Sequence, residues 1–317
     1  MSTERATVVL TEDRPAPASK RSGAAPRVRG RTGPSPLLAA PALVLFGVFA
    51  LVPLAGVVVL SLMKWDGVAD PAWIGLGNWT AALSDPATGH AIWLSVQVMV
   101  FSWLFQTPVS LLLGVLIARR GRYRAVLGVL YFLPMLLSSA AIAIAFKALL
   151  DPNFGLSRAF GANWLSQDWL GDPSITLYVV IFVIAWQFVP FHTLLYQAGV
   201  RQIPAQLYEA AQLDGAGVVR QFFHITMPQL RYTIITSSTL MLVGSLTYFD
   251  LVFVLTSGGP GNATRFLPLD MYLNGFSNND MGRASTLAVL LVVAGLALSL
   301  GLARLANFSR GSQLEGS

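Results

Sequence analysis

Six long apolar runs divide this chain, and they constrain its fold more than any other feature. They lie at about residues 37–63, 91–118, 125–149, 174–199, 232–256 and 284–306. A helix needs about 20 mostly apolar residues to cross the hydrocarbon core of a bilayer, and it satisfies its own backbone hydrogen bonds there. The runs therefore predict an all-α, polytopic membrane protein with six transmembrane helices.

The composition agrees with this fold class. Only 11% of the 317 residues are charged, whereas a soluble domain carries about 25%. The chain has no cysteine, which excludes disulfides, thiolate metal sites and cysteine nucleophiles.

The two ends differ from the apolar middle. Residues 1–35 are rich in Pro, Ala, Gly, Ser and Arg, so we expect a disordered basic tail. The first apolar run is too long for the core of a signal peptide, and Lys64-Trp65-Asp66 follows it in place of a small-residue cleavage site. We therefore predict an uncleaved first span, a transmembrane domain over 36–308 and a second short tail at 309–317.

The positions of the cations predict the orientation. With the N-terminus in the cytoplasm, sixteen of the 21 Lys and Arg residues fall in cytoplasmic segments, as the positive-inside bias requires. The other five are Lys64, Lys147, Arg158, Arg265 and Arg283. Both termini are then cytoplasmic, and the net charge of +6 reports topology and not nucleic-acid binding. We expect a multi-pass protein of the bacterial cytoplasmic membrane, in contact with membrane lipid.

A polar loop of about residues 201–231 joins the fourth and fifth runs. Pro204 suits the first turn of a helix, and Ala205 to Leu213 contains good helix formers. Gly215 and Gly217 are expected to supply the open backbone of a sharp turn. This helix is predicted either to dock in a partner's groove or to rest on lipid headgroups. The second role would favour more Lys and Arg, and there is none between Pro204 and Gly217.

The stretch "EAAQLDGAGVVRQFFHITMP", Glu209 to Pro228, resembles the EAA loop of ABC-importer permeases. In that family the loop forms coupling helices that sit in a cleft of a separate ATPase subunit. The resemblance implies a type I importer permease, with ATP and Mg bound by the partner ATPase and no cofactor in this chain. The positions that match the family pattern are Glu209, Ala210, Ala211, Asp214, Gly215, Phe223, Ile225 and Pro228. With Tyr208, Ala216 and Gly217 of the same helix and turn, they are the predicted coupling residues.

Two further stretches narrow the resemblance. "WIGLGNWTAAL" (73–83) and "TSGGPGNATRFLPLDMYLNGF" (256–276) resemble outer segments of the carbohydrate-uptake permeases that serve maltose-like oligosaccharides and glycerol phosphate. The chain looks most like the first of the two permeases in such systems. The implied partners are a second permease, an ATPase dimer and an extracytoplasmic solute-binding protein. The implied solute is an oligosaccharide or related polyol, with glycerol phosphate as the alternative.

Polar and aromatic residues in the fourth and fifth runs are candidates for the solute path. Polar groups inside a membrane bundle usually face its interior or a water-filled path, and aromatic faces beside hydrogen-bonding groups suit a sugar ring. Plain packing is the alternative for each residue, and Asp250 could instead lie at the outer headgroups. By resemblance, the candidates are Gln187, Phe188, Phe191, Ser245 and Tyr248, and Asp250 is added from the polar residues of the fifth run.

Motifs for catalysis or ATP hydrolysis are absent from the sequence. A P-loop needs Gly directly before Lys, but Lys20, Lys64 and Lys147 follow Ser, Met and Phe. We find no nucleophile or metal constellation for an intramembrane enzyme. An ion-coupled secondary transporter would favour ionisable residues deep in the spans, and these are nearly absent. The chain is therefore expected to be a transport subunit and not an enzyme.

Overall fold

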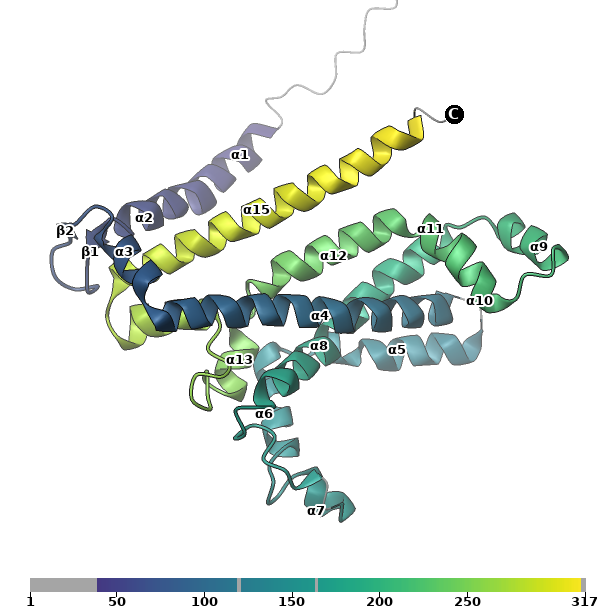
Figure 1. The fold of residues 1–317 in the computed structure, drawn as a ribbon, viewed down its shortest axis with the longest axis horizontal. Coiled ribbons are helices and arrows are strands. Elements are labelled where there is room, and N and C mark those ends of the chain that lie inside the picture. The colour runs from purple at the N-terminus through teal and green to yellow at the C-terminus, as the bar shows by residue number, and fades with distance from the viewer. Residues whose placement is uncertain (1–38, 119–120, 163–164, 315–317) are drawn as a thin grey trace, which may run out of the picture. The chain divides into compact units, whose positions relative to one another are not determined.

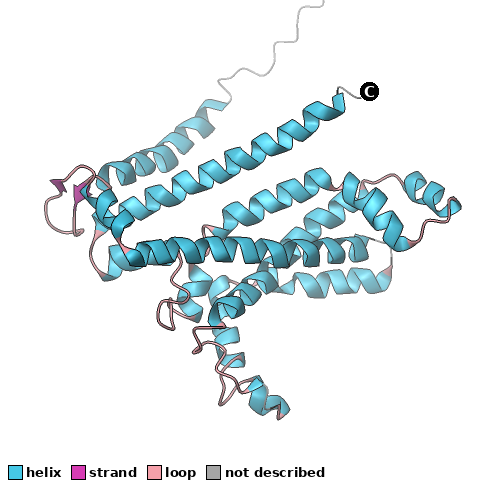
Figure 2. Cartoon of the chain, viewed as in Figure 1, coloured by secondary structure: helices cyan, strands magenta, loops and turns pink. Residues whose placement is uncertain are grey.

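The computed structural model describes residues 39–118, 121–162 and 165–314. Helices dominate, with two short strands (Figure 2). The chain separates into two compact units, Met1–Phe49 and Ala50–Ser317. In the described part of the first unit lie α1 (Ala40–Phe46) and the beginning of the π-helical turn η2 (Gly47–Leu51). The predicted tail 1–35 lies outside the described residues.

Four helical segments are long and apolar enough to cross a membrane in the described part of the chain. The first is Ala40–Leu60, which contains η2 and ends with α2 (Val52–Leu60). The others are α4 (Pro86–Ala118), α8 (Thr176–Arg201) and Met281–Arg304 of α15 (Met281–Leu314). Pro108 and Pro190 lie inside α4 and α8, and neither ends its helix.

The third and fifth predicted spans are not single helices. The third consists of α5 (Arg122–Leu136) and α6 (Ser139–Leu149), bent by 99° at the break between them. The fifth is divided into α12 (Arg231–Ser245) and α13 (Asp250–Leu255). The 15 residues of α12 rise only about 22 Å, short of the roughly 30 Å hydrocarbon core. Neither 125–149 nor 232–256 is therefore one continuous helix, and the count of six spans stays a prediction.

Within the second unit, α4, α8 and α12 pack together, and α6 packs on α13 (Figure 1). The largest cluster of buried apolar residues joins α4, α6, α8 and α13. Its fully buried members include Val98, Ala143, Val180, Val183, Ile184 and Val252. Helix α15 packs against α2, α12 and α14 (Leu267–Tyr272).

One end of this unit holds short connecting elements. Strands β1 (Met63–Lys64) and β2 (Ala72–Trp73) pair antiparallel, with Met63 opposite Trp73. Helix α3 (Gly77–Ser84) follows, and the Asn78 amide donates to the carbonyl oxygens of Ser61 and Met63 at 3.0 and 2.8 Å. Helix α7 (Leu156–Phe160) and the π-helical turn η5 (Leu273–Ser277) also belong to the connecting segments between the long helices.

The opposite end carries the loop between α8 and α12 (Figure 1). The loop contains α9 (Ala205–Leu213), α10 (Val218–Gln221), the π-helical turn η4 (Phe222–Thr226) and α11 (Met227–Gln229). The predicted order of helix, turn and helix is therefore observed.

Candidate functional site

Helix α9 ends in a turn that only a few residue types can form. The N–H of Ala216 donates to Ala211 O at 2.8 Å, and the N–H of Gly215 donates to Gln212 O at 3.0 Å. This pair of bonds is the Schellman motif, which places the residue after the C-cap in the left-handed region. Gly215 occupies that position with φ +76°. The predicted role of Gly215 in the turn therefore has a clear backbone cause.

Gly217 differs from the expectation for it. Its backbone is extended, with φ −68° and ψ 169°, and it stands as the N-cap of α10. Any residue adopts that conformation, so the prediction that Gly217 supplies unusual backbone freedom is wrong. The turn is closed instead by the Gln221 side chain, whose amide donates to Ala216 O at 2.7 Å.

One side chain ties α9 to the segment that leads into α12. The Tyr208 hydroxyl lies 2.9 Å from Thr226 Oγ1, and Thr226 is buried. No residue of α9 is buried in the described structure: Tyr208 and Ala211 are half-buried, and the other seven are exposed. A helix held at one point and otherwise open to its surroundings is available to a partner.

The remaining predicted coupling residues divide by exposure. Glu209, Ala210, Asp214, Phe223 and Pro228 are exposed, and Ala211, Ala216 and Ile225 are half-buried. Large apolar side chains beside them also face outward: Leu213 is 90% exposed and Val219 is 71% exposed. Soluble surfaces rarely gather such groups without a function in binding.

A groove of about 660 Å³ runs between this loop and the end of α4. Tyr208, Gln212 and Val219 line its loop side, and Leu112 and Leu116 line its α4 side. A partner protein that binds at this end of the unit would therefore meet the exposed helix α9 and the apolar groove between the loop and α4.

The second candidate site is a cavity of about 530 Å³ where α5, α6, α8, α12 and α13 meet. Five of the six predicted path residues line it: Gln187, Phe188, Phe191, Tyr248 and Asp250. The sixth, Ser245, does not line the cavity; it is buried and donates to Leu242 O at 2.7 Å.

The cavity wall combines aromatic rings with one side-chain amide, that of Gln187. The rings of Phe188 and Tyr248 stack with centroids 5.4 Å apart. The Gln187 amide donates to Ser139 Oγ at 3.0 Å, and its buried Oε1 has no partner among the described residues. A buried carbonyl oxygen without a donor is costly, so Oε1 is well suited to accept a hydrogen bond from a hydroxyl group.

Several lining residues were not predicted. Met135 and Ser139 reach the cavity from the two sides of the break between α5 and α6, and Gly244 and Thr247 from the end of α12. The signal for the break was Pro134 followed shortly by two serines, because proline disfavours helical continuation and Ser138 caps α6 by accepting from Ala141 N at 3.2 Å. Without the bend, Ser139 could not be placed beside Gln187.

Polar contacts also fasten the helices below the cavity. Trp103 Nε1 of α4 donates to Ser238 Oγ of α12 at 2.8 Å, and His192 Nδ1 of α8 lies 2.9 Å from Ser237 Oγ. His192 is thus hydrogen-bonded inside the bundle, as a packing histidine is, although its ring also lines the cavity. Searched over the described residues, the chain has no group of three or more His, Cys, Asp or Glu that could hold a metal ion.

The end opposite the α9 loop is tied by an ion pair. Arg283, at the start of α15, bonds the Asp85 carboxylate and donates to Thr88 Oγ1 at 3.1 Å. The Arg283 guanidinium, together with the N–H of Ala87, holds the pKa of Asp85 below its ordinary value. This contact joins the beginnings of two long helices, α4 and α15.

Comparison with known proteins identifies the family. A profile described as "Binding-protein-dependent transport system inner membrane component" matches residues 110–309. The chain belongs to this family. It is thus a permease of the ABC transporters, a class of transport subunits, and the resemblance noted in its sequence is confirmed.

Relatives and solved structures agree with the family. The probable ABC transporter permease YurN of Bacillus subtilis is 36% identical over 83% of this chain and 92% of its own length. The trehalose/maltose transport system permease MalF of Thermococcus litoralis is 28% identical, over 86% of this chain and 94% of its own. A bacterial ABC transporter involved in the import of alginate, 23% identical, matches 86% of this chain and 95% of its own with a TM-score of 0.75. The likeness to that structure shows a shared fold, that of an ABC importer permease.

Proposed function

We propose that this permease is one of two transmembrane subunits of an ATP-driven sugar importer and that α9 and its turn receive the motion of a separate ATPase. The observation that carries the proposal is the loop itself: an exposed helix, held to the bundle by Tyr208 and ended by a rigid left-handed turn at Gly215. A short helix of this kind suits a partner's groove. The absence of a P-loop in the sequence requires the ATPase to be another chain.

The proposed orientation places this loop in the cytoplasm. Arg122, Arg201, Arg220 and Arg231 stand at the ends of helices around it, and Arg283 stands at the far end of the second unit (Figure 1). Cytoplasmic ends of membrane helices carry the excess of cations. Six spans with both termini in the cytoplasm remain part of this proposal.

The proposed solute is a neutral oligosaccharide or related polyol, and it passes through the cavity at Gln187. Trehalose and maltose are named for the Thermococcus relative, and arabinooligosaccharides for a Bacillus relative that is 26% identical. The cavity offers two stacked rings, an unpartnered amide oxygen and one charged side chain, Asp250. It contains no cation, which disfavours glycerol phosphate and other anions.

The proposed partners are a second permease, a pair of ATPase subunits and an extracytoplasmic binding protein. A solute-bound periplasmic protein accompanies one structural neighbour, an alginate transporter. ATP binding would close the ATPase pair, and the loop would pass that motion to the helices around the cavity.

Cysteine cross-linking tests the coupling role directly, because the native chain has no cysteine and gives no background. Ala210→Cys, on the exposed side of α9, should cross-link to the co-purified ATPase subunit. The control is Val68→Cys, which is 94% exposed at the opposite end and should not. If Ala210→Cys captured no ATPase, or if Val68→Cys captured as much, the proposed docking would be wrong.

The solute class has a separate test. The binding protein encoded with this permease is screened against neutral oligosaccharides, polyols and glycerol phosphate by thermal shift. Stabilisation by a neutral sugar supports the proposal. A response to glycerol phosphate alone would leave the coupling role intact and refute the solute class.

A further inference from the structure

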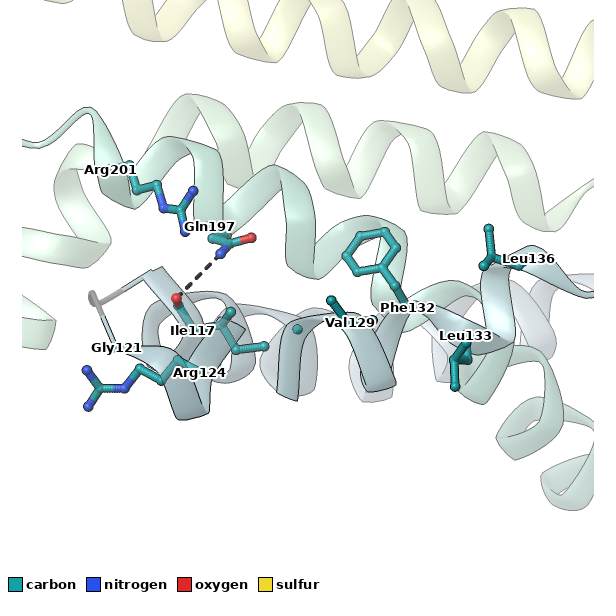
Figure 3. Close-up of a pocket in the computed structure, with 10 residues that line it drawn as sticks. Ile117, Gly121, Arg124, Val129, Phe132, Leu133, Leu136, Gln197 and Arg201 are labelled. Atoms are coloured by element: carbon teal, nitrogen blue, oxygen red, sulfur yellow. Dashed lines mark hydrogen bonds between the residues drawn. The ribbon is translucent and has the colours of Figure 1, made fainter. Parts of the chain in front are cut away.

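A third hollow lies on the surface of the bundle near its Arg-rich end. It is a groove of about 490 Å³ between α5 on one side and the ends of α4 and α8 on the other. Its side chains form two zones (Figure 3). Arg124 and Arg201 stand at one end, and Val129, Phe132, Leu133 and Leu136 continue away from them.

The apolar zone follows one face of α5. The lining positions 124, 128, 132 and 136 recur every four residues, and positions 129 and 133, also four apart, lie beside them. This is the spacing of residues on one face of a helix. Twelve residues of rise make this stripe about 18 Å long. That length is close to one leaflet, since the full hydrocarbon core measures about 30 Å.

A hydrogen bond between two helices closes the base of the groove. The Gln197 amide of α8 donates to the carbonyl oxygen of Ile117 in α4 at 3.4 Å, and in Figure 3 this bond lies between Arg201 above it and Arg124 below it. Gly128 has no side chain to fill the middle of the groove, and a Cβ at this position would meet only Ile117, at 3.7 Å. A larger residue at 128 would occupy the groove.

The charges in the groove have one sign. Among its ten lining residues, two are cationic and none is acidic. Val129, Leu133 and Leu136 are 68%, 50% and 78% exposed, so the apolar zone is open to the hydrocarbon in which such a bundle sits. Basic pockets between transmembrane helices bind the headgroups of anionic lipids.

We propose that this groove binds one anionic phospholipid. Its phosphate lies between Arg124 and Arg201, and an acyl chain lies along Val129, Phe132, Leu133 and Leu136. This groove shares no lining residue with the cavity at Gln187, and it shares Arg201 with the groove beside the coupling helix α9. The chemistry it recognises is an anionic headgroup joined to a chain about one leaflet long.

Native mass spectrometry of the full chain, with the subunits that co-purify with it, tests the proposal. The probes are phosphatidylglycerol and phosphatidylcholine added to the delipidated protein. Each arginine near the net negative charge of an anionic lipid is worth about fivefold in affinity, and phosphatidylcholine has a phosphate but no net charge. One phosphatidylglycerol should therefore bind about 30-fold more tightly than phosphatidylcholine.

Variants separate the two zones of the groove. Arg124→Gln with Arg201→Gln should abolish the preference for phosphatidylglycerol, whereas Arg304→Gln, at an exposed position on α15, should leave it unchanged. Gly128→Phe should weaken binding of both lipids by filling the apolar zone. Arg201 is exposed and Arg124 is half-buried, and the change to Gln keeps a polar side chain at each position, so these variants report on binding even if Gly128→Phe does not fold.

Two results would overturn the proposal. One is a phosphatidylglycerol preference that survives the loss of both arginines. The other is phosphatidylglycerol that binds to the isolated chain but not to the chain with its co-purified subunits attached. In that case a protein subunit, and not a lipid, would fill the groove in the complex.

Discussion

Substitution of Gly215 gives the sharpest test of how the coupling turn works. Its φ is +76°, and a Cβ built there meets nothing within 4 Å. Any effect of alanine at this position must therefore come from backbone strain and not from a clash inside this chain. An L-residue in the left-handed region loses about 1–2 kcal/mol, and asparagine loses less.

The strain converts into an expected loss of affinity. If α9 docks only when this turn is formed, a variant that reduces the fraction of molecules with the turn formed raises the apparent Kd for the ATPase by the same factor. A strain of 1–2 kcal/mol corresponds to about five- to thirtyfold. We expect the loss to increase from Gly215→Asn to Gly215→Ala to Gly215→Val, since β-branched residues tolerate positive φ least.

The assay is a titration of the purified ATPase subunit against each permease variant in nanodiscs. Gly217→Ala is the matched control, because Gly217 is extended and a Cβ there also meets nothing within 4 Å. The reasoning is refuted if Gly217→Ala weakens binding as much as Gly215→Ala does. It is also refuted if the asparagine and valine variants bind equally, because size and not backbone conformation would then decide.

Three further changes have definite expected outcomes. Tyr208→Phe removes the bond to Thr226, worth about 1 kcal/mol, so amide exchange in α9 should quicken about fivefold; unchanged exchange would contradict the anchor. Gln187→Leu removes the unpartnered carbonyl from the cavity and should raise the KM for solute up to about tenfold with the permease still folded, and an unaltered KM would place the solute elsewhere. Arg283 lowers the pKa of Asp85, so the ion pair contributes at most about 1 kcal/mol to stability at neutral pH, and this contribution is lost as the pH falls below about 4. In thermal unfolding, Arg283→Met should lack this loss of stability in acid. If the variant still loses the same stability in acid, other carboxylates cause the loss.

Local chemistry alone determined several features of this permease. The four unbroken spans follow from apolar length, because a lipid-facing helix depends on its own composition. The turn at Gly215 follows from its residue type, since glycine enters the left-handed region without penalty. The loop's place between two long helices follows from the contrast between polar and apolar segments.

The tertiary structure decided the rest. A bend of 99° between α5 and α6 brings Ser139 to Gln187, and no local pattern specified that angle. The same holds for the groove at Arg124 and Arg201, whose walls come from helices separated in the chain. The physical reason is that helix length and turn type depend on neighbours in sequence, whereas a cavity exists only where side chains from distant segments meet.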